Sequence, residues 1–301
     1  MTQPLISRRA FVATAGSVLV SEALFGQQSA QPIIDLHQHT NYLGRSDEAL
    51  VGHQRALGVQ KTVLLPAGSK YGLAADCGGN DTGMNLARRY PKEFFFFANE
   101  LPDLPEARPV IEKYLKAGAI GIGEQKFPVD CDSPHIVKIA ELAREFDVPI
   151  LLHFEHKMYN FGLERFHKVL DQFPTVRFIG HAQTWWGNID RDHDQTVMYP
   201  KTKVTPGGIT DRLLSDYPNM FGDLSAGSGL NSLLRDEDRT REFLQRHQDK
   251  LLFGSDCTDH EGSGEKCIGA KGIAAIRRLA PNTAVASKIF QQNIRRIMRV
   301  G

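Results

Sequence analysis

The sequence predicts an α/β protein built as a single (β/α)8 TIM barrel. Eight short apolar runs rich in β-formers recur along the 301 residues, and amphipathic stretches of helical period separate them. Strands that alternate with helices of about ten to fifteen residues indicate βαβ units and a parallel sheet. Eight such units in about 270 residues match the usual length of one closed barrel. The Gly-rich phosphate loop that an open dinucleotide-binding sheet needs after its first strand is absent from the sequence.

The expected elements follow one another in a regular order. The strands are expected at residues 33–36, 61–65, 94–98, 119–123, 149–152, 177–179, 220–224 and 251–254. The main helices are expected at residues 46–57, 104–116, 133–146, 162–172, 236–247 and 283–298. Ser133 before Pro134 is a typical N-cap followed by a proline at the first helical position, and Asp103 is expected to open its helix similarly.

The N-terminal segment is expected to be an export signal. Arg8 and Arg9 precede a weakly apolar run at residues 12–25, which is too short to span a bilayer. The arginine pair resembles the bacterial twin-arginine signal, whose pathway carries folded proteins. We therefore expect residues 1–30 to be a signal with a short lead-in, residues 31–301 to be the barrel, and the protein to be periplasmic or secreted. A frayed basic N-terminus is the alternative.

Composition narrows the class of partner. Hydrophobic residues make up 41% of the chain and charged residues 24%, which is typical of soluble globular proteins, and the formal charge is +1. A nearly neutral chain without a basic stripe argues against nucleic acid as a partner. Outside the signal, no apolar run reaches transmembrane length. We expect a small-molecule substrate and no membrane insertion after signal removal. A homo-oligomer is possible, and the sequence leaves the oligomeric state open.

Residue types that bind metals or move protons follow the apolar runs. His37 and His39 close the first run, and the strand period of two places both imidazoles, with Asp35, on the face that points into the barrel mouth. Later runs end in Glu124 and Lys126, in His153, in His181, in Asp223 and in Asp256. Barrel enzymes keep catalytic groups at these carboxyl ends, and paired neutral imidazoles suit a divalent metal.

This series of motifs, from Asp35-x-His37-x-His39 to the helix at residues 290–296, resembles the amidohydrolase superfamily, specifically its amidohydrolase-related (amidohydrolase 2) metal-dependent hydrolases. The resemblance covers the whole chain after the signal. It implies that the metal ligands are His37, His39, His153 and Asp256, with His181 either a ligand of a second metal or an acid/base residue beside the first. Glu124 is the implied bridge between two metals, with a carboxylated Lys126 as the alternative. One metal or two stays open.

The implied ligand set predicts hydrolysis at neutral pH. Zinc with nitrogen and carboxylate ligands keeps a position for water and lowers its pKa from about 15.7 to near 7; manganese or iron also accept these ligands. Asp256 is expected to take the proton of that water, and His181 to stabilise the oxyanion or protonate the leaving group. The predicted function is an exported metal-dependent hydrolase of an amide, a lactone or another ester.

Two other functions compete with hydrolysis. Some members of the family carry out non-oxidative decarboxylation on the same metal site, and such an enzyme needs a cationic clamp for the substrate carboxylate. Arg45, Arg191 and Lys70 are the candidates in mouth-side loops. The second alternative is a non-catalytic binding barrel whose histidines only hold metal.

Further residues are expected beside the mouth or away from it. Trp185 and Trp186 lie in the longest expected loop, residues 183–206, and either wall a substrate pocket or pack on the rim. Asp223 and Lys126 are further candidates for substrate contact. Histidines in helical stretches are expected in solvent, and they are His53, His135, His167 and His247. Of the four cysteines, Cys257 and Cys267 are the closest pair in sequence for a bridge.

Overall fold

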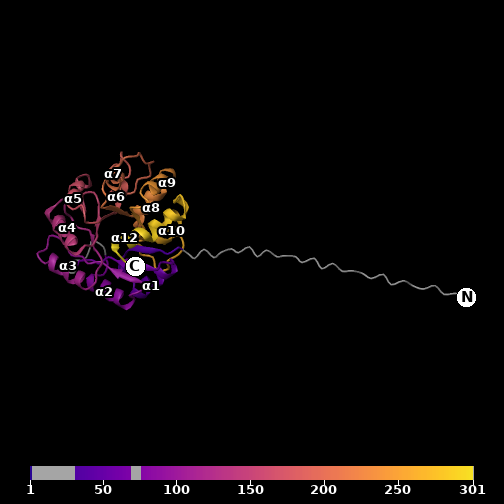
Figure 1. Cartoon of the computed structure of the whole chain (residues 1–301), viewed down its shortest axis with the longest axis horizontal. Coiled ribbons are helices and arrows are strands. Elements are labelled where there is room, and N and C mark those ends of the chain that lie inside the picture. Colours follow the sequence, from indigo (N-terminus) through magenta and orange to yellow (C-terminus); the bar gives the residue numbers. More distant parts are fainter. Residues whose placement is uncertain (2–30, 69–75, 301) are drawn as a thin grey trace. The chain divides into compact units, whose positions relative to one another are not determined.

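The structure, a computed structural model, describes residue 1 and residues 31–68 and 76–300 (Figure 1). The chain divides into two units, Met1–Gln31 and Pro32–Gly301, and the fold described here is that of the second unit. The twin-arginine signal expected in residues 1–30 lies outside the described residues, apart from Met1. Within the described part of the chain, no helix has both the length and the apolar character needed to cross a membrane.

Every expected strand forms, and neighbouring strands are parallel. The strands are β1 (Ile34–Gln38), β2 (Lys61–Leu64), β3 (Phe94–Phe96), β4 (Ile122–Gln125), β5 (Ile150–His153), β6 (Phe178–His181), β7 (Met220–Asp223) and β8 (Leu251–Leu252). They pair in chain order as one sheet of β1 to β3 and one of β4 to β8. Each side chain at a strand's carboxyl end therefore arrives at the same edge of the structure.

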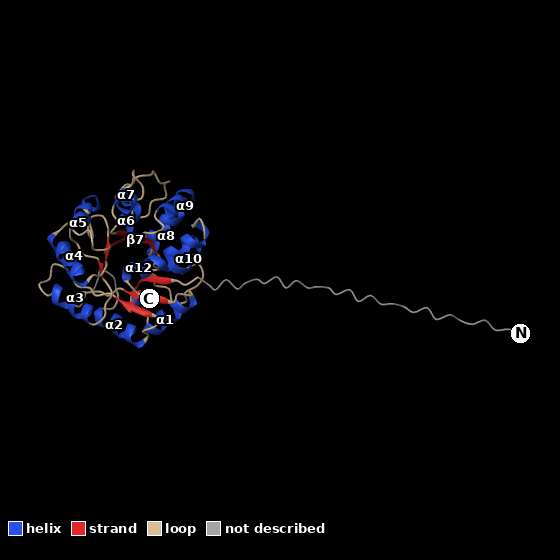
Figure 2. Ribbon diagram, viewed as in Figure 1, coloured by secondary structure: helices blue, strands red, loops and turns tan. Residues whose placement is uncertain are grey.

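Backbone hydrogen bonds join the two sheets at both seams. Between β3 and β4, the N–H of Ala98 donates to the carbonyl of Gly121 (2.9 Å). Between β8 and β1, the N–H of Leu36 donates to the carbonyl of Phe253 (3.0 Å). Helices surround the strands (Figure 2). The predicted single (β/α)8 barrel is confirmed.

The helices surround the strands, except that the last helix lies at the end of the barrel where the strands begin. They are α1 (Asp47–Ala56), α2 (Asn80–Arg89), α3 (Ala107–Lys116), α4 (Pro134–Phe146), α5 (His167–Gln172), α6 (Gln183–Gly187), α7 (Ile209–Asp216), α8 (Ala226–Leu234), α9 (Glu237–Arg246), α10 (Ile268–Leu279), α11 (Thr283–Ser287) and α12 (Asn293–Met298). Two 3₁₀ turns, η1 (Tyr42–Gly44) and η2 (Leu163–Arg165), and one π-helical segment, η3 (Lys288–Gln292), complete them. The expected last helix at residues 283–298 forms without a break as α11, η3 and α12, and the expected loop at 183–206 begins with α6.

Local capping explains where two of these helices begin. The Oγ of Ser133 accepts a hydrogen bond from the N–H of Ile136 (3.4 Å), and a proline occupies the first turn of α4, as expected. The expected opening of α3 at Asp103 is wrong. The N–H of Ala107 first closes a turn on the carbonyl of Leu104 (3.1 Å), so the helix begins four residues after Asp103.

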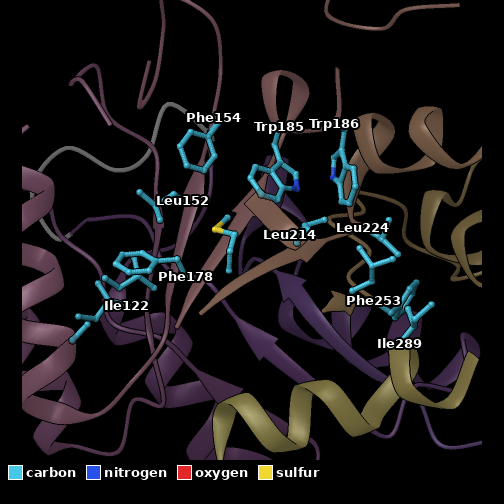
Figure 3. Packing of buried hydrophobic residues seen from close by; sticks show 14 of the residues in the cluster. Ile122, Leu152, Phe154, Phe178, Trp185, Trp186, Leu214, Leu224, Phe253 and Ile289 are labelled. Atoms are coloured by element: carbon cyan, nitrogen blue, oxygen red, sulfur yellow. The ribbon is translucent and has the colours of Figure 1, made fainter. Parts of the chain in front are cut away.

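Two apolar layers support the carboxyl ends of the strands. The outer layer lies between strands and helices and includes Ile122, Phe178 and Trp185 (Figure 3). The inner layer fills the barrel, and Ile294 and Ile297 of α12 belong to it. Helix α12 is attached where the strands begin, so the opposite end of the barrel is left for the polar residues.

Candidate metal centre

One extra residue in β1 and one in β4 change the direction of the side chains that follow them. In β1, Asp35 pairs with Thr62 of β2, and Gln38 pairs with Leu64. In β4, Ile122 pairs with Ile150 of β5, and Gln125 pairs with Leu152. Three steps along one strand thus match two steps along its partner. Such a β-bulge breaks the alternation of faces and redirects the side chains that follow it.

The bulge in β1 overturns the expectation that Asp35 shares a face with His37. The Asp35 carboxylate accepts hydrogen bonds from Gln54 Nε2 of α1 (3.1 Å) and from the backbone N–H of Ser255 (2.8 Å). Its side chain therefore ties β1 to α1 and to the end of β8 and does not enter the mouth. Burial raises the pKa of Asp35, against the lowering effect of these hydrogen bonds.

His37 and His39 present one nitrogen each to a common point. His37 Nδ1 lies 2.7 Å from Asp223 Oδ2, and His39 Nδ1 donates to the carbonyl of Leu65 (2.7 Å). A carbonyl oxygen only accepts, so His39 carries its proton on Nδ1 and offers the lone pair of Nε2. The two Nε2 atoms are 3.2 Å apart. A cation that both nitrogens contact is the partner that removes the repulsion between facing lone pairs.

Asp256 adds a carboxylate to these two imidazoles. Its Oδ1 lies 3.5 Å from His39 Nε2 and 3.9 Å from His37 Nε2. This oxygen is buried and has no hydrogen-bond partner among the described residues. A buried carboxylate oxygen without a partner is costly. A divalent metal fits this set of two nitrogens and one unpaired oxygen.

The carboxylate of Glu124 lies between two pairs of histidines. Its Oε2 is 3.7 Å from the Nε2 atoms of both His37 and His39. Its Oε1 is 2.5 Å from His153 Nδ1 and 3.8 Å from His181 Nε2. One oxygen therefore faces the pair from β1 and the other faces the pair from β5 and β6, which is the arrangement of a carboxylate that bridges two metals.

A glycine allows Glu124 to reach this position. Gly123 has φ +138°, and a Cβ there would lie 2.6 Å from the carbonyl oxygen of Leu151. Any side chain at this position would push β4 away from β5.

The histidines on the Oε1 side are held by other polar groups. His153 Nε2 lies 3.0 Å from Glu155 Oε2, so both of its ring nitrogens face carboxylates. His181 Nδ1 lies 3.0 Å from Ser225 Oγ, which itself donates to Asp223 Oδ2 (2.8 Å). The single hydroxyl proton of Ser225 is thereby used, so His181 carries its proton on Nδ1 and offers the lone pair of Nε2.

The histidines of the site differ in pKa: those of His37 and His39 are raised, and that of His181 is lowered. Burial lowers the pKa of His37, but the carboxylates of Asp256, Asp223 and Glu124 together outweigh burial and raise that pKa well above its usual value. Burial likewise opposes Cys77 and Asp256 at His39, whose pKa is raised to about 10. Burial and the charge of His37 lower the pKa of His181 to about 4. His181 is thus neutral at pH 7, the form that binds metals.

The structure brings most of the predicted metal ligands together. Ligand atoms lie within 4.8 Å of one another in two groups, His37 with His39 and Asp256, and His37 with Glu124 and His181. His153 belongs to neither group and reaches them through its hydrogen bond to Glu124. Its ligation of a metal stays a prediction.

The two tryptophans pack behind the site. Trp185 is fully buried, stacks on Phe154 at 5.9 Å between ring centroids, and lies where a Cβ on Gly180 would be (Figure 3). Trp186 is buried as well, and its indole N–H donates to the carbonyl of Asp223 (2.8 Å). Packing and support of β6 and β7 are the roles that these contacts show, and substrate contact by either residue stays a prediction.

Asp223 and Lys126 occupy different surroundings from each other. Asp223 is fully buried and accepts hydrogen bonds behind His37 and Ser225, so it orients the imidazole and does not face the mouth. Lys126 is half-buried, with Nζ 5.4 Å from the ring centre of Tyr159 at the rim. Glu124, and not Lys126, lies between the two pairs of histidines. Substrate contact by Lys126 and the bridging of two metals both stay predictions.

Two positioning residues were missed by the sequence reasoning. Glu155 lies two residues after His153, and Ser225 lies two residues after Asp223, and each contacts a site histidine. The strand period of two, continued past the end of each apolar run, was the signal that points to them.

The arginines considered as a carboxylate clamp are already engaged. Arg45 is fully buried and donates to the carbonyls of Cys257 (2.7 Å) and Asp259 (2.8 Å). Arg191 is exposed and pairs with Asp192. Lys70 lies outside the described residues.

A sequence model of a protein family described as Amidohydrolase matches residues 72–300. The chain matches no curated protein sequence. Several solved structures share its fold, and three of them illustrate the range. An uncharacterised TIM-barrel protein from Bordetella bronchiseptica has a TM-score of 0.64 at 14% identity, covering 89% of this chain and 98% of its own.

The other two structures carry enzyme names. A probable 2-pyrone-4,6-dicarboxylic acid hydrolase from Acinetobacter baumannii, with citric acid bound, has a TM-score of 0.61 at 13% identity and covers 89% of this chain and 99% of its own. A 5-carboxyvanillate decarboxylase from Novosphingobium aromaticivorans, complexed with manganese, has a TM-score of 0.53 at 15% identity and covers 83% and 79%.

Proposed function

Because this chain belongs to the amidohydrolase family, we propose that it is a metal-dependent hydrolase that cleaves a C–N or C–O bond of a small molecule. An amide, a lactone or another ester is the substrate class. The observation that carries the proposal is the unpaired, buried Oδ1 of Asp256 beside the Nε2 atoms of His37 and His39. These atoms are placed to hold a divalent metal and to accept a proton next to it.

The residues have separate roles in the proposed reaction. His37, His39 and Asp256 would hold one ion, and Glu124, whose other oxygen faces His153 and His181, would hold a second ion together with them. When bound, a divalent metal supplies Lewis acidity that activates water and polarises the bond under attack; zinc is preferred, and manganese or iron suit the same donors.

Proton transfer falls to Asp256. Its carboxylate accepts a proton from the water as the oxygen adds to the carbonyl carbon. It then returns that proton to the leaving nitrogen or oxygen as the C–N or C–O bond breaks, so water is divided between the two products. His181 is neutral near pH 7 and serves as a ligand on the Oε1 side.

The test is a comparison of two reactions on the metal-loaded protein. A panel of amides, lactones and other esters is assayed for hydrolysis, and a panel of aromatic carboxylates is assayed for release of carbon dioxide. The proposal expects turnover in the first panel. Carbon dioxide release without hydrolysis would contradict it and favour a decarboxylase, and tight metal binding without turnover in either panel would favour a binding barrel.

Export is a second part of the proposal. Arg8 and Arg9 with the apolar run after them support delivery to the periplasm, or secretion, by the twin-arginine route. Replacing both arginines by lysine is expected to leave the precursor in the cytoplasm, as measured by fractionation. Unchanged delivery of that variant would contradict this route.

A further inference from the structure

A second cluster of ligand-type side chains lies outside the site described so far. It consists of His53 on α1, Cys257 and Asp259 in the segment after β8, and Cys267 at the start of α10. His53, Cys257 and Cys267 are all buried, with exposed fractions of 0%, 1% and 0%. The burial of His53 overturns the expectation that it lies in solvent; His247 is buried as well. We name this group the Cys257–Cys267 cluster.

The distances within the cluster are those of ligands around one small cation. The Sγ atoms of Cys257 and Cys267 are 3.8 Å apart, and His53 Nε2 lies 3.4 Å from Cys267 Sγ. Tetrahedral zinc with Zn–S of about 2.3 Å and Zn–N of about 2.0 Å places two sulfurs about 3.8 Å apart, and a nitrogen about 3.5 Å from a sulfur. Both separations agree with that geometry.

A carboxylate, that of Asp259, lies next to the three side chains His53, Cys257 and Cys267, whose ligand atoms are all within 4.8 Å of one another. Asp259 Oδ2 lies 3.9 Å from His53 Nε2, and its side chain is 15% exposed. The backbone N–H groups of Glu261 and Gly262 donate to the same oxygen (3.1 and 2.8 Å) and fix the carboxylate in place. Two thiolates and one imidazole supply three of the four ligands of a structural zinc site, and Asp259 is the neighbouring carboxylate that we take as the fourth.

The protein around the cluster is built to hold it. The buried Arg45 donates to the carbonyl oxygens of both Cys257 and Asp259, which fixes the segment that carries two of the ligands. The two thiolates and the carboxylate carry three negative charges, a divalent ion balances two of them, and the positive charge of Arg45 offsets the one that remains. A Cβ on Gly262, which has φ +72°, would lie 2.3 Å from the carbonyl oxygen of His53, so only glycine allows this close approach.

The same two cysteines do not form a disulfide in the structure. Both are free thiols, and their sulfur separation of 3.8 Å far exceeds the bond length of about 2.05 Å. The neighbouring imidazole and carboxylate have no part in a disulfide, whereas both are ligands in a zinc site. The full set of contacts therefore favours a metal.

We propose that the Cys257–Cys267 cluster binds a structural zinc ion, held by Cys257, Cys267, His53 and Asp259. Cys257 directly follows Asp256 in the sequence, so the ion would fasten the segment after β8 to α1 and to α10. The zinc site thereby helps to fix the position of Asp256 at the mouth. This inference does not depend on which reaction the mouth catalyses.

Cobalt substitution tests the proposal by a signal that only thiolates produce. Protein stripped of metal and refilled with Co(II) is expected to show the near-ultraviolet thiolate-to-cobalt absorption. Cys257→Ser and Cys267→Ser are expected to lose this absorption together with one bound zinc ion per chain. Cys131→Ser, which changes a buried thiol far from the cluster in sequence, is the matched control and is expected to keep both.

Cys77 needs a control of its own because it lies near His39. The proposal expects Cys77→Ser to keep the thiolate absorption, and its loss in that variant alone would contradict the assignment. Asp259→Asn, a milder change, is expected to weaken zinc binding without unfolding the protein, as judged by circular dichroism. A protein whose unfolded, alkylated chain has the mass of a Cys257–Cys267 disulfide would overturn the proposal.

Discussion

The two sides of the Glu124 carboxylate differ in how far their histidines are already committed to other groups. On the Oε2 side, His37 and His39 each use Nδ1 to contact the protein and leave Nε2 directed at one point. On the Oε1 side, both nitrogens of His153 face carboxylates, those of Glu124 and Glu155. A metal on the first side has only to displace protons from the imidazoles, whereas on the second side His153 must also be separated from Glu124.

This difference shows that a histidine at a strand end is ready to bind a metal when one nitrogen is held from outside and the other has no partner inside the site. Asp223 and the carbonyl of Leu65 provide that support for the Oε2 side. We therefore expect a tightly bound ion beside His37, His39 and Asp256, and a more weakly bound ion beside His153 and His181.

The largest expected effect separates catalysis from binding on the tight side. Asp256→Asn keeps one oxygen for the metal and removes the group that accepts the proton. Turnover is expected to fall by about 10²–10⁴-fold, the usual contribution of a general base, while part of the metal stays bound. Turnover on the best substrate and metal content are measured together, and near-normal turnover with full metal would show that Asp256 is not the base.

The next effect removes the support behind His37. Asp223→Asn takes away the charge that holds Nδ1, and loss of such an outer partner costs about 10–100-fold in metal affinity. The affinity of the tight ion is measured by competition with a chelator, and thermal unfolding checks that the barrel is intact. An unchanged affinity for the tight ion would remove the physical basis of the comparison.

A smaller effect is expected on the other side. Glu155→Gln releases His153 Nε2 from its carboxylate and is expected to weaken only the second ion, by about tenfold. It is the matched control for Asp223→Asn, because both variants remove one negative charge behind a histidine. Equal losses at both ions in either variant would mean that the two sides are not distinct.

The smallest effect is a dependence of metal affinity on pH. Metal and proton compete for Nε2 of His39, whose pKa is raised to about 10 by its surroundings, and the pKa of His37 is also raised. A raised pKa means that protons must leave on binding, so affinity is expected to rise with pH between about 6 and 9. Calorimetry in buffers of different ionisation enthalpy counts the protons, and binding without proton release would contradict the raised values.

Most of the site residues that the sequence could predict lie at the carboxyl ends of strands. The apolar runs and their period located His37, His39, Glu124, His181 and Asp256 correctly at one end of a single barrel. This succeeds because parallel strands in a closed barrel present all their carboxyl ends at the same mouth.

Bulges and burial of polar groups were beyond the sequence reasoning. The extra residue in β1 turns Asp35 toward Gln54, although simple alternation places it beside His37. His53 and His247 follow helical patterns, yet His53 faces the two cysteines and His247 lies 2.6 Å from Asp211. These contacts join residues that are far apart in the sequence, so the periodicity of a helix or a strand does not reveal them.

An anomalous difference map from a crystal of the zinc-loaded protein tests the central claim most directly. The account predicts a peak about 2.0–2.2 Å from His37 Nε2, His39 Nε2 and a carboxylate oxygen of Asp256. A weaker peak is expected on the Oε1 side of Glu124. A mouth without any peak, or one whose only peak is held by His153 and His181, would contradict the account.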